Sequence, residues 1–281
     1  MQDRKAVWPW VLAGVVVLGG AAWWLFRDDL EPLASLSPFA AHAPATSEAR
    51  AGAAPPVAAA PAAVSAPAQA EHPLQRDASA DAALPSLAAS DGAARDALTG
   101  LFASDVLALL QQDHLIQRLV THVDNLTETR VPATALAVRP LPGSLQVEGD
   151  AASGTTIAAG NAARYAPWVS AFTHADADAL AAAYMRLYPL VQQAWRELGH
   201  PDGRFNDRLV GVIDHLLQTP EPARPLAVEL DPRGRYRFVD PDLQARSVGQ
   251  KLLLRLDAGQ SQAVRQQLRA IRQAVTRGAP D

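Results

Sequence analysis

The chain has 281 residues, a formal net charge of −4 and no cysteine. Without cysteine there are no disulfides, no thiolate metal sites and no cysteine nucleophiles. The length allows one sizeable globular domain in addition to terminal segments.

The chain begins with an uncharged apolar run, VWPWVLAGVVVLGGAAWWLF, at residues 7–26. At about 1.5 Å per residue, a helix of this length spans roughly 30 Å, the thickness of the hydrocarbon core of a bilayer. Tryptophans stand at both ends of the run, where indole rings prefer the headgroup region. Arg4 and Lys5 precede it, whereas the letters that follow are RDDLE. We therefore predict a single transmembrane helix, a signal-anchor, whose stub 1–6 stays in the cytoplasm.

A cleaved signal peptide is the alternative interpretation of this run. The apolar region of such a peptide is normally about 7–15 residues, which is shorter than the run observed. The cleavage-like letters Ala41-His42-Ala43 lie far from the run and are followed by Pro44. The uncleaved anchor is favoured, and it predicts a bacterial inner-membrane protein with its C-terminal domain in the periplasm.

Residues 27–90 are dominated by alanine, proline and small polar residues, most clearly in AGAAPPVAAAPAAVSAPAQA at 51–70. Proline removes a backbone donor and disfavours helix at the residue before it. The segment has too few large apolar side chains to offset the entropy of ordering. We predict a disordered linker whose r.m.s. reach is about 40–50 Å.

The globular domain is predicted over residues 91–277, and its first part reads as short helices. Ser90 is the expected N-cap of a helix that begins at Asp91. Apolar residues at helical spacing follow near 104–110 and 115–123, then short strands near 145–157, then a helix from Asn161.

The two strongest helices follow. Thr173 and Asp176 resemble a capping box, and Gly199 is expected at the C-terminal end of the first helix. Its predicted apolar stripe consists of Leu180, Tyr184, Leu187, Val191, Trp195 and Leu198. Asn206 is the expected N-cap of the second helix, with Phe205 and Val210 as a hydrophobic staple. A short turn joins the two, so we expect an antiparallel helical hairpin at the core.

The C-terminal part predicts a β-hairpin and two more helices. LAVEL at 226–230 and RYRFV at 235–239 flank a turn in which Gly234 takes positive φ. Ser247 is the expected cap of the next helix. The last helix is amphipathic, with Val264, Leu268, Ile271 and Val275 on its apolar face. The predicted fold class is therefore mainly α with a small β-hairpin, an α+β domain.

Charge is unevenly distributed, with −6 over residues 91–223 and +5 over 224–281. Either the acidic and basic parts of one domain face each other, or the basic end meets an anionic polymer of the envelope. Arg265, Arg269 and Arg272 form a basic stripe on the last helix, which we interpret as its solvated side; the alternative is contact with phosphate or with an acidic face of a partner. The orientation and the net charge argue against nucleic acid as a partner.

Motifs for catalysis, metal binding and cofactor binding are missing from the sequence. The histidines show no metal-ligand spacing, and neither GxSxG nor a phosphate-binding glycine loop occurs. We expect no metal, no cofactor and no catalytic residues. The best candidate binding face contains Tyr184, Tyr188, Arg208 and His215, of which Arg208 and His215 share one side of a helix.

Three stretches carry a resemblance to a known family: RYAPWV, LYPLVQQAWRELGHPDGRFNDRLVGVIDHLL and SVGQKLLLRL. With the anchor and the linker, they resemble a bacterial family catalogued as a domain of unknown function, numbered 3014, over about residues 84–277. The pattern is most specific around Tyr188, Gly199-His200-Pro201, Phe205-Asn206-Asp207 and Gly249-Gln250-Lys251. The resemblance implies a membrane-anchored envelope protein and brings no functional residues with it.

The leading functional hypothesis is a non-enzymatic interaction or scaffold protein of the cell envelope. Its expected partners are the membrane and an envelope protein or anionic polymer. The alternative is a periplasmic binder of a small ligand or polymer, or an unrecognised hydrolase, that uses the face near Tyr184, Tyr188, Arg208 and His215.

Overall fold

The computed structural model describes residues 71–74, 83–108, 110–131, 137, 144–150, 154–232 and 234–277. Within these ranges the chain is mainly helical with one small antiparallel sheet, which confirms the predicted α+β class. The helical elements are η2 Leu87–Ala89, α2 Asp91–Thr99, α3 Ser104–Leu107, α4 Leu115–Asn125, α5 Asn161–Thr173, α6 Ala177–Glu197, α7 Phe205–Leu217, α8 Pro241–Gln244, α9 Val248–Arg255 and α10 Ala258–Thr276. The strands are β1 Val147–Asp150, β2 Gly154–Ile157, β3 Ala227–Leu230 and β4 Tyr236–Phe238.

The predicted membrane segment 7–26 lies outside the described residues, so the transmembrane helix stays a prediction. Among the helices that the structure does describe, none is both long and apolar enough to cross a bilayer. Packed residues extend N-terminal to the predicted domain start at residue 91. Leu87 of η2 belongs to the core, and Leu74 and Leu84 pack against it.

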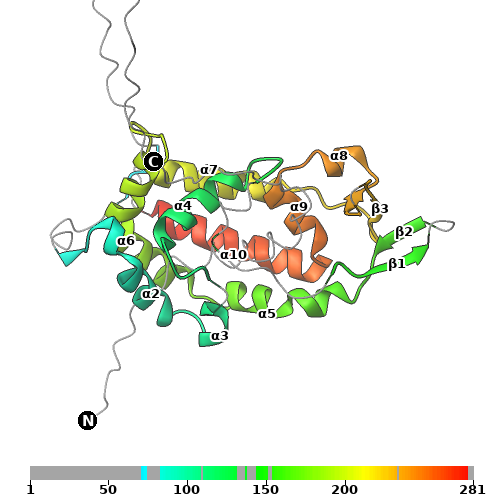
Figure 1. Ribbon diagram of the computed structural model, residues 1–281, viewed down its shortest axis with the longest axis horizontal. Helices are drawn as coiled ribbons and strands as arrows, with labels where there is room; N and C mark the ends of the chain where they lie inside the picture. Colours follow the sequence, from blue (N-terminus) through cyan, green and yellow to red (C-terminus); the bar gives the residue numbers. More distant parts are fainter. Residues whose placement is uncertain are drawn as a thin grey trace, which may run out of the picture.

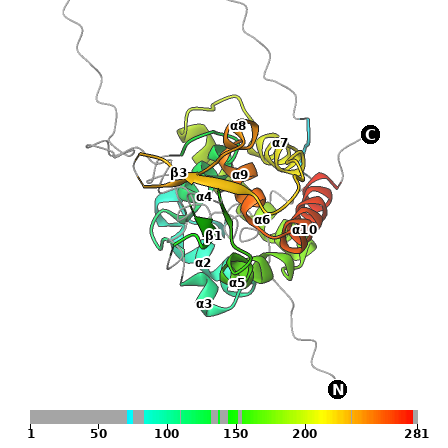
Figure 2. The same cartoon turned by 90° about the vertical axis from the view of Figure 1, so that its right-hand side faces the viewer.

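Helix α10 crosses the middle of the view in Figure 1 and lies at one side of the molecule in Figure 2, with one face exposed. It packs against α5, α6 and α7, and in the end-on view of Figure 2 it lies beside α5 and α6. Its predicted apolar face is buried: Val264, Leu268, Ile271 and Val275. Helices α6 and α7 follow each other through a short turn, as predicted, but each packs more extensively on α10 than on the other. The core is therefore built around α10, not around the α6–α7 hairpin alone.

The predicted basic stripe on α10 is not a single solvated face. Arg265 is buried, and its guanidinium donates to two carbonyl oxygens at the C-terminal end of α7. Arg272 forms a two-pronged ion pair with Asp214 of α7, at 2.6 and 2.9 Å. Arg269 is exposed. The prediction was wrong for Arg265 because helix spacing groups these positions but cannot reveal that α7 ends against one of them.

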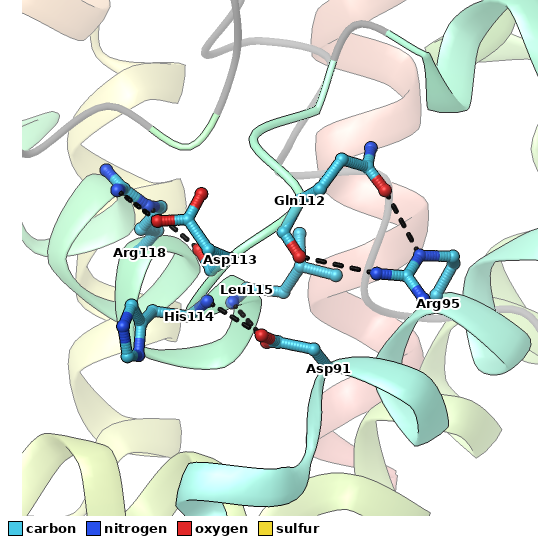
Figure 3. Close-up of polar contacts among 7 residues, drawn as sticks. All are labelled: Asp91, Arg95, Gln112, Asp113, His114, Leu115 and Arg118. Carbon is cyan, nitrogen blue, oxygen red and sulfur yellow. Dashed lines mark hydrogen bonds and ion pairs between the residues drawn. The ribbon is translucent and has the colours of Figure 1, made fainter.

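Helix α4 packs against α6 and is capped at its N-terminus by a carboxylate from α2 (Figure 3). Asp91, the first residue of α2, accepts hydrogen bonds from the backbone N–H groups of His114 at 3.0 Å and Leu115 at 2.8 Å. A carboxylate at this position satisfies free donors and complements the helix dipole. His114 has φ 55°, a left-handed conformation, and Arg95 of α2 donates to Gln112 just before it. Two side chains of α2 thus hold the turn that starts α4.

Two predicted helix starts differ in detail from the structure. Ser90 occupies the N-cap position of α2, but its hydroxyl donates back to the Leu87 carbonyl at 2.7 Å. Helix α6 begins after Asp176, whose carboxylate accepts the N–H groups two and three residues further on. Thr173 is the last residue of α5, so the predicted Thr173–Asp176 capping box is wrong. Asp176 caps the helix without it.

Helix α7 begins two residues earlier than predicted. Its N-cap is Arg204 and its first residue is Phe205, so the predicted Asn206 cap and the Phe205–Val210 staple are wrong. Asn206 instead points inward and is 1% exposed. At the end of α6, Leu198 is exposed and does not continue the predicted apolar stripe.

The sheet has the order β1-β2-β3-β4 with every pair antiparallel, and it lies at one end of the molecule in Figure 1. The predicted hairpin of β3 and β4 is confirmed, with Gly234 at φ 76° in its turn. The sequence also indicated short strands near 145–157, and these are β1 and β2. Pairing of β2 with β3 joins the two hairpins, and a small second core forms there: Leu226, Val228, Phe238, Leu243 and Leu254.

Helix α9 begins as predicted, with the Ser247 hydroxyl accepting the N–H of Gln250. Gly249 lets this helix approach the end of α4, because a Cβ there would lie 2.8 Å from the Leu126 carbonyl oxygen. Lys251 is buried and donates to the Thr129 carbonyl at 3.3 Å. The motif Gly249-Gln250-Lys251 therefore has a structural role at the start of α9.

A buried histidine predicts how stability depends on pH. His122 of α4 is buried, and within the described residues neither of its ring nitrogens has a hydrogen-bond partner. Burial lowers the pKa of His122 to about 4, whereas in the unfolded chain it is about 6.5. Its contribution is therefore fully present above pH 6.5 and is lost as the pH falls towards 4. Between pH 7 and pH 4 we predict a loss of about 3 kcal/mol from this group.

Urea unfolding at pH 7 and pH 4 tests this prediction. In His122→Leu the free energy of unfolding falls less between the two pH values than in the wild type, by about 3 kcal/mol. The exposed His174→Gln serves as the matched control and keeps the wild-type dependence. An identical pH dependence in His122→Leu and wild type contradicts the assignment.

Candidate functional site

Tyr184 and Tyr188, two of the four predicted site residues, lie one turn apart on α6. Their rings meet edge to face at 5.5 Å, and Tyr184 also packs against Phe205 at the start of α7. Burial raises the pKa of the Tyr184 hydroxyl well above its ordinary value. Tyr184 is a core residue, whereas the Tyr188 hydroxyl donates to Gln192 at 2.8 Å and lies at a groove.

Arg208 joins α7 to the end of α4. Its Nε donates to the carboxylate of Asp124 at 2.7 Å, and its Nη2 donates to the Asp124 carbonyl and to the Thr127 hydroxyl, each at 2.7 Å. Three charge-assisted hydrogen bonds use most of the donors of this guanidinium. The arrangement is that of a structural arginine.

His215 contacts the start of α9. Its Nε2 lies 2.8 Å from the Ser247 hydroxyl oxygen, and its backbone carbonyl accepts a hydrogen bond from the Gln250 side chain at 3.0 Å. Burial lowers the pKa of His215, and the positive charges of Arg208 and Arg246 lower it further. The distance resembles that of a serine–histidine catalytic pair. Ser247, however, is 5% exposed and caps α9, so a substrate has no access to its hydroxyl.

The four predicted residues thus form two pairs. Tyr184 and Tyr188 share an aromatic cluster with Phe205, and Arg208 and His215 lie close enough for the charge of one to act on the other. Of the first pair only Tyr188 borders a groove, and the second pair holds α4 and α9 against α7.

Replacing Arg208 tests its structural role. We predict that Arg208→Ala lowers the free energy of unfolding by about 1–3 kcal/mol, because the Asp124 carboxylate loses its charged donor. Arg186→Ala, at an exposed position of α6, should stay within about 0.5 kcal/mol of wild type. Chemical denaturation at neutral pH measures both. Wild-type stability of Arg208→Ala together with a lost biological activity would assign this arginine to a ligand.

A segment of the chain itself, residues 71–74, borders the groove beside Tyr188 and is bound by the start of α7. The Asp207 carboxylate accepts the backbone N–H of His72 at 2.7 Å, and the Asn206 side-chain amide donates to the His72 carbonyl at 2.8 Å. Two adjacent side chains therefore bind both main-chain polar groups of one residue. This is recognition of the backbone, which does not depend on the side chain presented.

The groove has a volume of about 390 Å³ and lies between segment 71–74 and the ends of α6 and α7. Pro73 and Leu74 line one wall. The opposite wall carries Tyr188, Pro189, Gln192, Arg196 and Arg204. It thus combines an apolar surface with two arginines, a mixture suited to peptide segments.

Gln192 fixes the shape of this wall. Its Oε1 accepts the Tyr188 hydroxyl and the backbone N–H of Phe205 at 3.0 Å, and its Nε2 donates to the Gly203 carbonyl at 2.7 Å. In the same turn the His200 ring stacks on Trp195, with centroids 3.7 Å apart. The α6–α7 turn is thus held firmly against α6 before it reaches Asn206.

The sequence interpretation missed His72 and the roles of Asn206 and Asp207. His72 lies in a region assigned to the linker by composition. For Asn206 a signal exists, since it shares helical spacing with the buried Leu209 and Ile213 and so belongs to the inward face of α7. A polar residue on an apolar face needs a partner, which points to a buried hydrogen bond.

The arrangement defines a mainly helical α+β domain with a groove bordered by segment 71–74. In the ranges described by the structure, no group of three or more His, Asp or Glu side chains is placed to hold a metal ion. The chain belongs to the family described as protein of unknown function DUF3014, whose sequence model matches residues 115–272. That range includes α4 to α7, both hairpin strands β3 and β4, and most of α10. Neither the comparison with curated proteins nor the comparison with solved structures finds a match.

Proposed function

We propose that this protein is a non-enzymatic interaction protein of the cell envelope, and that its domain binds extended peptide segments in the groove beside Tyr188. The binding of both backbone groups of His72 by Asn206 and Asp207 carries this proposal. Main-chain hydrogen bonds give affinity for any extended segment, and neighbouring pockets give selectivity. Segment 71–74 is then an occupant in cis, and a partner segment takes its place in trans.

The proposed location is the bacterial inner membrane, with the domain on the periplasmic side. It is supported by the apolar run 7–26, the basic residues before it and the acidic residues after it. The Ala/Pro-rich composition that follows suits a spacer that lets the domain reach partners. A C-terminal fusion to a reporter enzyme that is active only outside the cytoplasm tests the orientation. An inactive fusion that is nonetheless made in full contradicts it.

Peptide binding in trans tests the function. In the full chain in detergent, deleting residues 68–78 removes the backbone that Asn206 and Asp207 bind and leaves the wall formed by α6 and α7 unchanged. A labelled peptide of sequence AQAEHPLQRDA, residues 68–78, should then bind with a Kd on the order of 10–100 µM. The unaltered chain should bind it several times more weakly, because its own segment competes. Fluorescence anisotropy measures both affinities.

Two matched variants distinguish peptide binding in the groove from nonspecific binding. Asp207→Ala in the deletion background removes the acceptor of the peptide N–H and should weaken binding about tenfold. Asp202→Ala removes an exposed carboxylate from the nearby α6–α7 turn and should leave binding unchanged. Equal affinities of the two variants would show that the peptide does not use this groove.

The alternative function, a ligand binder or hydrolase that uses Tyr184, Tyr188, Arg208 and His215, has one observation on its side. This is the 2.8 Å approach of His215 to the Ser247 hydroxyl. The burial of that serine and its capping role count against it. Turnover of activated esters by wild type that disappears in Ser247→Ala would favour the hydrolase. If wild type does not turn over these esters, the hydrolase interpretation is excluded for them.

A further inference from the structure

A second cleft, of about 590 Å³, lies between the loop after α7 and the first half of α10. Three arginines line it: Arg224, Arg265 and Arg269. Among the lining residues that the structure describes, Glu221 is the one acidic side chain. The cleft therefore has an excess of positive charge in a protein whose net charge is negative.

The floor of the cleft is one face of α10. Ser261, Gln262 and Gln266 line it together with Arg265 and Arg269, and these positions recur every three to four residues. The face begins in the first turns of α10, where the helix dipole adds positive potential. Hydroxyl and amide donors thus stand between the guanidinium groups.

Arg265 is held in place by neutral groups. Its Nη1 and Nη2 donate to the Leu217 and Thr219 carbonyls at 3.1 and 2.7 Å, and its side chain is only 6% exposed. Carbonyl oxygens orient a guanidinium without cancelling its charge. Its Nε has no hydrogen bond within the described residues, and the Glu221 Oε1 lies 3.6 Å from it. The Glu221 side chain is 80% exposed, so water screens most of its charge.

We propose that this cleft binds a phosphoryl group, either free phosphate or a phosphodiester unit of an anionic polymer. The positive charge selects an anion, and planar guanidinium donors match the oxygens of a tetrahedral phosphoryl group. Arg265 supplies a fixed positive charge beneath the floor of the cleft, and the exposed Arg224 and Arg269 contact the ligand from the rim. Glu221 competes with the ligand for this positive charge.

Calorimetric titration of the full chain in non-ionic detergent tests the site, with inorganic phosphate in one arm and a glycerol phosphate oligomer in the other. Chloride keeps the ionic strength constant. Saturable binding is expected, and Arg224→Gln and Arg269→Gln should each weaken it about tenfold. Glu221→Gln removes the competitor and should tighten binding about threefold. The proposal thus predicts opposite changes in affinity within one cleft: weaker binding in the two arginine variants and tighter binding in Glu221→Gln.

Arg186→Gln, which removes one exposed arginine from α6, serves as the control and should bind phosphate like wild type. Thermal unfolding of each variant confirms that it is folded. Tighter binding of the oligomer identifies a polymer as the source, and equal binding identifies the free anion; both support the site. No saturable binding in either arm, or the same weakening in Arg186→Gln, overturns the proposal.

Discussion

Helix α10 packs against α5, α6 and α7, and the polar side chains on its packed face must therefore find partners inside the protein. Gln260 donates to the Ala162 carbonyl and Gln267 to the Ala175 carbonyl, each at 2.7 Å, while Arg265 holds the end of α7. An unpaired buried polar group costs about 1–3 kcal/mol, so each pair favours one position of a neighbouring helix strongly. The register of α10 thus sets where α5 begins, where α6 begins and where α7 ends.

The same constraint connects the fold to the two proposed sites. The Asn206 amide that binds the His72 carbonyl also donates to the Val275 carbonyl of α10, at 3.3 Å. The peptide groove is therefore anchored to the C-terminal end of α10. The arginine cleft uses the first half of the same helix, through Ser261, Arg265 and Arg269. The two proposed sites therefore lie at different positions along one helix, which is about 28 Å long.

Apolar periodicity was sufficient to predict the buried faces of α4 and α10, because one face of each helix meets the core. It could not place Asn206 or Arg265, because both are polar residues on inward faces and their partners come from distant parts of the chain. The sequence likewise indicated both hairpins but not their union, since the pairing of Thr155 with Val228 is a long-range contact. Local patterns do not encode such contacts.

The candidate site was predictable only in part, for the same reason. Helical spacing correctly placed Arg208 and His215 near each other, but their partners, Asp124 and Ser247, lie on α4 and before α9. These contacts make the pair structural. Tyr188 was named as a neighbour of the candidate face and does line a groove, although segment 71–74 on the other side of that groove came from a region assigned to the linker by its composition.

The chain contains no cysteine, so engineered pairs report on single contacts without background. The most direct test of the account combines Leu74→Cys with Arg196→Cys, which lie on the two walls of the groove, and treats the full chain in native membranes with a short thiol-specific cross-linker. We predict efficient cross-linking of the groove pair within one chain, and a lower yield when Asp207→Ala is added. The control pair of Leu74→Cys with Arg269→Cys should give little cross-linked product. Equal yields in the two pairs, or a groove pair that is indifferent to Asp207→Ala, would contradict the account.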